Sequence, residues 1–280
     1  MDVDYKHLDN MIKGNILFKV IFLIFISFSI LYSQELVLGV VPQQSSLKML
    51  KSWQPIAEYL SQETGVKVVY KTEKTIAAFE KSLYSSRYDM AYLNPYQFVL
   101  LHKRLNYAAK VRASKNIVGI VVADKIKKIQ EFLQEDPTFL FPSSRAFAAT
   151  LLIKYELAQK FNYRFDDAKK IRYVNSHDSV YKGVSRGFGD LGGGIERTFN
   201  VFSDSASKKN LNIVYTTEAY PSHPFAFHPK ITESLQNKLI NALIHMPEHL
   251  KKRLKVKRFI RIEKNEYKSV QNLASLIGTE

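Results

Sequence analysis

One segment of the chain, residues 173–199, combines the residue types of two kinds of site. It reads YVNSHDSVYKGVSRGFGDLGGGIERTF. The glycines from Gly187 to Gly192 have the G-x-G-x-x-G spacing of a dinucleotide-binding loop. Ser176, His177 and Asp178 are the residue types of a hydrolase triad. The elements that surround these residues decide whether either chemistry is possible.

The glycines do not stand where a dinucleotide site needs them. Such a loop follows a strand and opens a helix, whereas the stretch DSVYKGVSR before these glycines predicts a helix. We expect Gly187 to end that helix with a positive φ. We expect residues 192–194 to form a strand edge to which another group packs closely. The segment therefore predicts no nucleotide site.

The neighbouring Ser176, His177 and Asp178 cannot form a catalytic relay, because the side chains of consecutive residues diverge. Ser176 is better interpreted as the N-cap of the helix, with His177 and Asp178 in its first turn. A helix N-terminus carries free N–H groups and a partial positive charge, and both suit an anion. The segment predicts either an anion site or a plain helix cap. Glu196 and Arg197, after the glycines, are interpreted as a structural charge pair.

A second strand-to-helix turn has similar chemistry. In FLFPSSRAF the predicted strand ends at Pro142, and Ser143 or Ser144 is expected to cap the next helix, with Arg145 beside it. In open α/β sheets, ligands bind at the carboxyl ends of strands. The two turns can therefore converge on one oxyanion.

The order of the elements predicts an α/β fold with two lobes, each a mostly parallel sheet flanked by helices. Strands and helices alternate from residue 35 to 105, and a second series starts at 116. The stretch 211–221 is a strand long enough to cross between lobes. We predict two lobes. The first consists of residues 34–115 and 215–280, and the second consists of residues 116–214, with hinge strands near 112–120 and 211–220.

The N-terminal segment has the features of an export signal. Lys13 and Lys19 precede an apolar run from Val20 to Tyr32, and the run is shorter than the ~20 apolar residues of a spanning helix. We predict that residues 1–33 form a signal peptide, with a retained membrane anchor as the alternative. The rest of the chain is then periplasmic.

Composition excludes several classes of function. The chain has no cysteine, which excludes disulfides, thiolate nucleophiles and cysteine-ligated metals. Its net charge of +15 would suit nucleic acid or an anionic surface. An exported protein rarely meets nucleic acid, so we interpret the basic run at 251–261 as a solvated face. The positive field of the chain can also steer small anions to a cleft. We predict no nucleic-acid partner, no metal and no cofactor.

Five segments taken in order resemble one family, the phosphate-, phosphite- and phosphonate-binding proteins of ABC importers (the PhnD-like group). They are GVVPQ, YDMAYLNPYQFV, FPSSRAFAATLL, the segment at 173–199, and TTEAYPSHPFAFHP. The resemblance covers roughly residues 35–270. It implies a type II periplasmic-binding fold whose two lobes close on a tetrahedral phosphorus oxyanion.

The resemblance also implies roles for single residues. Tyr92 would face the cleft, Ser144 would match a serine of the family's Ser-Thr-Ser turn, and His177 would match its ligand-binding histidine. Arg145 departs from that turn, and His223 stands where relatives often carry an aspartate. A histidine at position 223 predicts that affinity falls as the pH rises through the ordinary histidine range near ~6.5.

We therefore predict a binding protein without catalytic residues. It would capture phosphate, phosphite or a phosphonate as a monomer and deliver it to the membrane permease of an ABC importer. The alternative is a binding protein that signals to a membrane sensor. An extracellular hydrolase would need a nucleophile beside a base, or a metal site, and neither is apparent. The candidate ligand-binding residues are Tyr92, Asn94, Tyr96, Ser143, Ser144, Arg145, Ser176, His177, Asp178 and His223.

Overall fold

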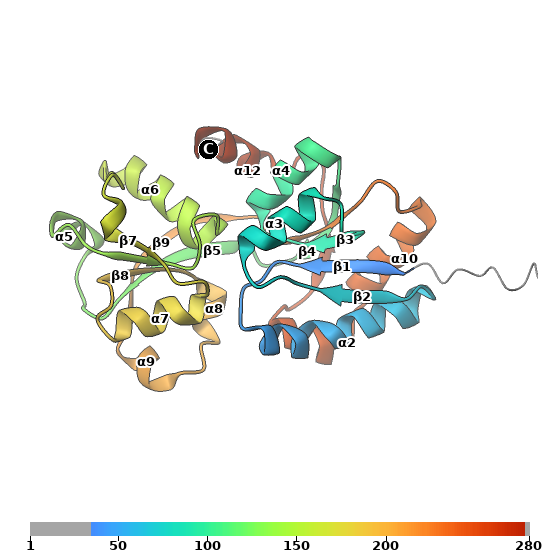
Figure 1. Cartoon of the computed structure of the whole chain (residues 1–280), viewed down its shortest axis with the longest axis horizontal. Helices are drawn as coiled ribbons and strands as arrows, with labels where there is room; N and C mark the ends of the chain where they lie inside the picture. Colours follow the sequence, from blue (N-terminus) through green and yellow to red (C-terminus); the bar gives the residue numbers. More distant parts are fainter. Residues whose placement is uncertain (1–34, 278–280) are drawn as a thin grey trace, which may run out of the picture. The chain divides into compact units, whose positions relative to one another are not determined.

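The structure is a computed structural model that describes residues 35–277. The predicted signal peptide or anchor, residues 1–33, lies outside the described residues. The described strands form two sheets, and helices cover both faces of each sheet (Figure 1). We call each sheet with its helices a lobe.

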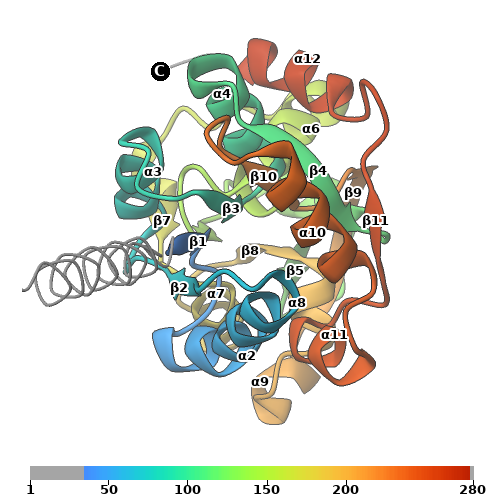
Figure 2. The ribbon, with the colours of Figure 1, turned by 90° about the vertical axis from the view of Figure 1, so that its right-hand side faces the viewer.

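The first lobe contains a six-stranded sheet in the order β11-β4-β10-β3-β1-β2. Its strands are β1 (Leu36–Val40), β2 (Val68–Lys71), β3 (Met90–Tyr92), β4 (Ala108–Ala113), β10 (Pro224–Phe227) and β11 (Phe259–Arg261). Alternate residues of β1 face opposite sides of the sheet. Leu38 packs with a first group of helices, whereas Val37 packs against a second group. The first group is α2 (Ser46–Thr64), α10 (Glu233–Ile244) and α11 (Glu248–Leu254). The second group is α3 (Ile76–Tyr84), α4 (Pro95–Leu105) and α12 (Lys268–Ile277), with α12 packed beside α4 (Figures 1 and 2).

The second lobe contains a five-stranded sheet in the order β7-β6-β8-β5-β9. Its strands are β5 (Ile117–Ala123), β6 (Phe139–Phe141), β7 (Ile171–Tyr173), β8 (Leu191–Ile195) and β9 (Asn212–Tyr220). One face packs on α5 (Ile129–Gln134) and on the helix formed by η1 (Phe147–Leu151) and α6 (Leu152–Phe161). The other face packs on α7 (His177–Ser185) and α8 (Glu196–Asn200), with α9 (Ser205–Lys209) beyond α7. A short 3₁₀ turn, η2 (Ala168–Lys170), precedes β7.

Both sheets are mixed, whereas the order of the elements predicted mostly parallel sheets. Strand β1 is parallel to β2 and β3, but β10 is antiparallel to β3 and β4. Strand β6 is parallel to β7 and β8, but β5 is antiparallel to β8 and β9. The chain crosses between the sheets at residues 114–116 and 221–223, and each antiparallel pair in the described chain includes a strand beside a crossing. Strands β5 and β10 enter from the other lobe without a helical crossover, so they are not constrained to be parallel to their neighbours.

The glycine-rich strand β8 lies in the middle of its sheet, between β6 and β5, and not at an edge as expected. Close packing is confirmed on both of its faces. A Cβ atom on Gly193 would lie 2.1 Å from the carbonyl oxygen of Ala149, and one on Gly194 would lie 2.3 Å from the hydroxyl of Tyr181. The glycines therefore let η1 and α7 approach the sheet closely.

We expect the Gly193→Ala change to lower the free energy of unfolding by about 1–3 kcal/mol, because its methyl group would overlap a backbone oxygen that cannot rotate away. Gly187→Asn is the control: Gly187 has φ 73° with nothing within 4 Å of a Cβ position, and asparagine tolerates this conformation. Urea unfolding measures both. Equal stability of the Gly193 variant and the native chain would contradict the close packing.

Candidate functional site

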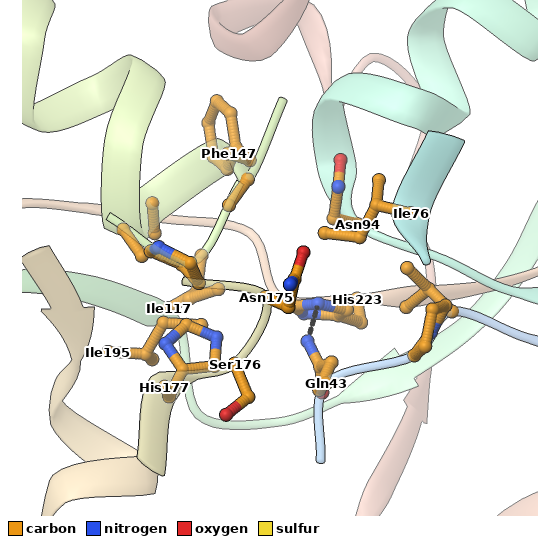
Figure 3. A pocket seen from close by; sticks show the side chains of 16 residues that line it. Gln43, Ile76, Asn94, Ile117, Phe147, Asn175, Ser176, His177, Ile195 and His223 are labelled. Atoms are coloured by element: carbon orange, nitrogen blue, oxygen red, sulfur yellow. Dashed lines mark hydrogen bonds between the residues drawn. The ribbon is translucent and has the colours of Figure 1, made fainter. Parts of the chain in front are cut away.

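A small cavity lies between the lobes, where strands of both sheets end (Figure 3). Gln43 follows β1, Asn94 follows β3 and Asn175 follows β7, while His223 comes from the second crossing. The cavity volume is about 20 Å³, which exceeds the ~10–15 Å³ that one water needs. The cavity has room for a small ion and not for a sugar or a nucleotide.

Four helical segments begin at this cavity. Ile76 opens α3, Asn94 caps α4, Phe147 opens η1 and Ser176 caps α7, and all four residues line the cavity. Three of these ends are capped by side chains: Thr75 accepts from the N–H of Ala78, Asn94 accepts from that of Gln97, and Ser176 accepts from that of Ser179. The remaining first-turn N–H groups and the partial positive charge of each helix end favour an anion. Among the described residues that line the cavity, none is acidic.

His177 is a buried polar residue of the cavity lining whose side chain the protein itself leaves partly unsatisfied. The residue is 4% exposed, and its Nδ1 atom has no hydrogen-bond partner within the described chain. Burial lowers the pKa of His177 to about 4; the charge of Asp178 opposes this shift, and the charge of Arg197 adds to it. A neutral imidazole with an unpaired ring nitrogen is costly to bury, and a bound ligand would satisfy it.

His223 enters the cavity from a different side than His177 (Figure 3). The Gln43 amide donates to its Nε2 atom at 2.6 Å, so the ring is neutral with its proton on Nδ1. Burial lowers the pKa of His223 well below the ordinary value, and the charges of Arg197 and His177 lower it further. The ordinary pKa that we assumed from the sequence is therefore wrong for this residue, because the side chain is almost fully buried.

The structure brings four of the predicted residues to the cavity: Asn94, Ser176, His177 and His223. Tyr92 lies next to it, with its ring stacked on His223 at a centroid distance of 5.4 Å. Tyr92 also packs on Trp53, with ring centroids 4.7 Å apart, and both residues line a neighbouring cavity.

Arg145 and Tyr96 lie elsewhere. The Nε atom of Arg145 is 2.7 Å from a carboxylate oxygen of Glu80, and its guanidinium lies over the Tyr96 ring at 5.7 Å. These residues line a separate hollow with Tyr84, and neither lines the cavity between the lobes. The carboxylate of Glu80 on α3 therefore pairs with Arg145, which we had predicted from the sequence to bind the ligand.

The serines at 143 and 144 do not cap the following helix as predicted. The chain makes one further turn, in which the N–H of Ala146 donates to the carbonyl oxygen of Ser143. The helix then begins at Phe147 without a side-chain cap, and Ser144 is exposed. Residues 146–149 line the cavity in place of the two serines.

Asp178 forms a salt bridge across the lobes with Lys48 of α2, at 2.6 Å. The Glu196–Arg197 pair was a wrong interpretation: Glu196 pairs with Lys115 at 2.7 Å, and Arg197 forms no salt bridge with residues 35–277. Sequence reasoning also missed Gln43 and Asn175 as lining residues. Their position just after strand ends was the available signal.

Two further properties concern the whole described chain. Between residues 35 and 277, no group of three or more His, Cys, Asp or Glu side chains is placed to hold a metal ion. Within the same range, no helix has both the length and the apolar character needed to cross a membrane.

The two mixed sheets, the double crossing and the cavity between the lobes define a type II periplasmic-binding fold. A model of the periplasmic substrate-binding proteins of phosphonate ABC transporters matches residues 38–267. The chain belongs to this family, which confirms the resemblance that the motifs indicated. Members of the family are binding proteins and not enzymes, as predicted.

Solved structures show the same fold. A binding component of an ABC phosphonate transporter from Pseudomonas aeruginosa superposes with a TM-score of 0.78 at 15% identity, covering 87% of this chain and 86% of that chain. PhnD1 from Prochlorococcus marinus, in complex with methylphosphonate, has a TM-score of 0.78 at 18% identity, covering 88% and 98%. XAC2383 from Xanthomonas citri, bound to ATP, has a TM-score of 0.66 at 16% identity, covering 87% and 96%.

Proposed function

We propose that this protein captures a phosphorus oxyanion in the cavity between its lobes and presents it to the membrane permease of an ABC importer. The observation that carries the proposal is the cavity itself, at which four helical segments begin and two neutral histidines meet without an acidic neighbour in the lining. Helix N-termini and neutral N–H donors bind a compact oxyanion without a fixed cation. The relative that holds methylphosphonate supports this choice of ligand.

The histidines also suit an oxyanion that keeps or loses a proton near neutral pH. A neutral imidazole has one donor nitrogen and one acceptor nitrogen, so His177 is able to face either a P–O⁻ or a P–OH group. The Nδ1 proton of His223 supplies a second donor, since its Nε2 is engaged by Gln43. An aspartate at this position would demand a protonated ligand, and a neutral histidine does not.

Lobe closure fits the same proposal. The two crossings at residues 114–116 and 221–223 are short, so they can act as hinges. The pairs Lys48–Asp178 and Arg145–Glu80 each join a side chain of the first lobe to one of the second. We propose that these pairs open when the lobes separate to admit the ligand.

A thermal-shift and calorimetry series with phosphate, phosphite, methylphosphonate, sulfate and acetate tests the proposed function. We expect one of the phosphorus oxyanions to bind most tightly, and a ligand at 100 times its Kd adds about 2.7 kcal/mol to the free energy of unfolding. Stabilisation by acetate or sulfate, with none by the three phosphorus oxyanions, would refute the assignment.

A further inference from the structure

A larger, basic space adjoins the oxyanion cavity. It consists of two hollows of about 260 and 300 Å³, and Arg197, Val201 and Lys255 line both of them. His223 lines the first hollow and the oxyanion cavity, and Gln43 lines the second hollow and the oxyanion cavity. We call the two hollows together the basic annex. The annex therefore lies directly beside the oxyanion cavity, with Gln43 and His223 at their common boundary.

Positive charge dominates the annex. Its basic lining residues are Lys48, Lys51, Lys115, Arg197, Arg253, Lys255 and Lys257. Within the described chain, Glu196 is the single acidic residue of the lining, and it pairs with Lys115. Lys48 is paired with Asp178. Two of the cations are thus neutralised by carboxylates, and the others leave a strong positive excess.

Arg197 is one of the two cations that line both hollows. It is half-buried, and it forms no salt bridge with residues 35–277. Its charge lowers the pKa of both His177 and His223, so it lies close to the oxyanion cavity as well as to the annex. A partly desolvated guanidinium without a carboxylate is unfavourable unless an anion accompanies it.

Helices from both lobes build the annex. Lys48 and Lys51 lie on α2, Arg253 lies at the end of α11, and Arg197 lies on α8 of the second lobe. Figure 2 shows these helices on one side of the described chain. A ligand in the annex would therefore touch both lobes at once.

We infer that the ligand is an organic phosphonate or phosphate monoester whose substituent carries a second negative charge, and that this substituent occupies the annex. The inference rests on the proposed function, because the phosphoryl group takes the oxyanion cavity. Phosphate or methylphosphonate would fill that cavity and leave the annex empty. An aminoalkyl substituent would place a cation among cations, and its affinity would suffer.

Four phosphonates separate the effect of charge from that of size: 3-phosphonopropionate, methylenediphosphonate, propylphosphonate and 2-aminoethylphosphonate. By calorimetry on the full protein, we expect one or both of the doubly anionic compounds to bind at least about tenfold more tightly than propylphosphonate, the gain of one charge-assisted contact. We expect 2-aminoethylphosphonate to bind more weakly than propylphosphonate. The two anionic arms show whether the annex takes a carboxylate or a second phosphoryl group, and the advantage should shrink as salt rises.

Variants assign the advantage to the annex. Arg197→Gln and Lys255→Gln should each reduce the affinity for the doubly anionic ligand more than that for propylphosphonate. Lys238→Gln, on the exposed face of α10 and outside the annex, should change neither. Equal affinities for propylphosphonate and for the two compounds with a second anionic group would overturn the inference and leave the proposed function standing. Failure of all four compounds to bind would overturn the proposed function, and the inference with it.

Discussion

Replacement of His177 by alanine is expected to weaken the binding of the preferred phosphorus oxyanion by about 1.5–3 kcal/mol, the range for a hydrogen bond to a charged group. The reason is that His177 is buried, neutral and unsatisfied within the described chain. Its ring nitrogen has no other partner there for the ligand to displace. The expected result is a Kd that rises by one to two orders of magnitude in a folded variant.

The matched control is Asp178→Asn, one residue further along the same helical turn. Asp178 is engaged by Lys48 across the lobes, and both side chains are partly exposed, so this change should cost less than about 1 kcal/mol. Calorimetry at neutral pH, with circular dichroism to confirm folding, measures both variants. An unchanged Kd for His177→Ala would show that His177 does not bind the ligand and is only a residue of the first turn of α7.

Acidification is expected to destabilise the ligand-free protein through the same histidines. The pKa of His177 is about 4 in the folded chain, below the ordinary value of 6.5. Between these pH values the unfolded chain binds more protons than the folded chain, so the free energy of unfolding falls as the pH falls. The full effect is about 3 kcal/mol for His177, at about 1.4 kcal/mol per pH unit, and His223 acts in the same direction.

Urea unfolding at pH values from 4 to 8 measures this dependence. The His177→Gln variant should show a shallower loss of stability between pH 6.5 and 4, because it lacks the group that gains the proton on unfolding. His249→Gln is the control, since His249 is exposed on α11. If all three proteins lose the same stability on acidification, the histidine at 177 does not have a lowered pKa.

Ligand binding is expected to be coupled to proton uptake by the same histidines. A bound anion favours the protonated form of a nearby histidine, so binding should be accompanied by proton uptake at acidic pH and by little uptake at pH 8. The steep change near ~6.5 that an ordinary histidine would produce is not expected. Calorimetry in two buffers with different ionisation enthalpies measures the number of protons taken up.

Local features of the site could be predicted because they depend on neighbours in the chain. Ser176 caps α7 as expected, since a hydroxyl before an amphipathic helix reaches the N–H groups of its own first turn. The positive φ of Gly187 was also expected. Asn94, which was not predicted as a cap, caps α4 by the same local chemistry. The family and its fold were also recognisable, because several short motifs stand in order along the chain.

Other features depend on residues far apart in the sequence, and there the tertiary structure decided. Arg145 stands in a turn that suits a ligand, but Glu80, from another lobe, lies within reach of its guanidinium. Arg197 has a neighbouring glutamate, but Lys115 engages that carboxylate and leaves the arginine beside the site. His223 is an ordinary histidine in the sequence, yet burial and an amide 180 residues away keep it neutral. The sequence by itself determined the alternation of strands and helices and the start of α7 at Ser176. Which charges meet, and which side chains lose water, followed only from the packing of the two lobes, because electrostatic energies depend on distance and burial in space.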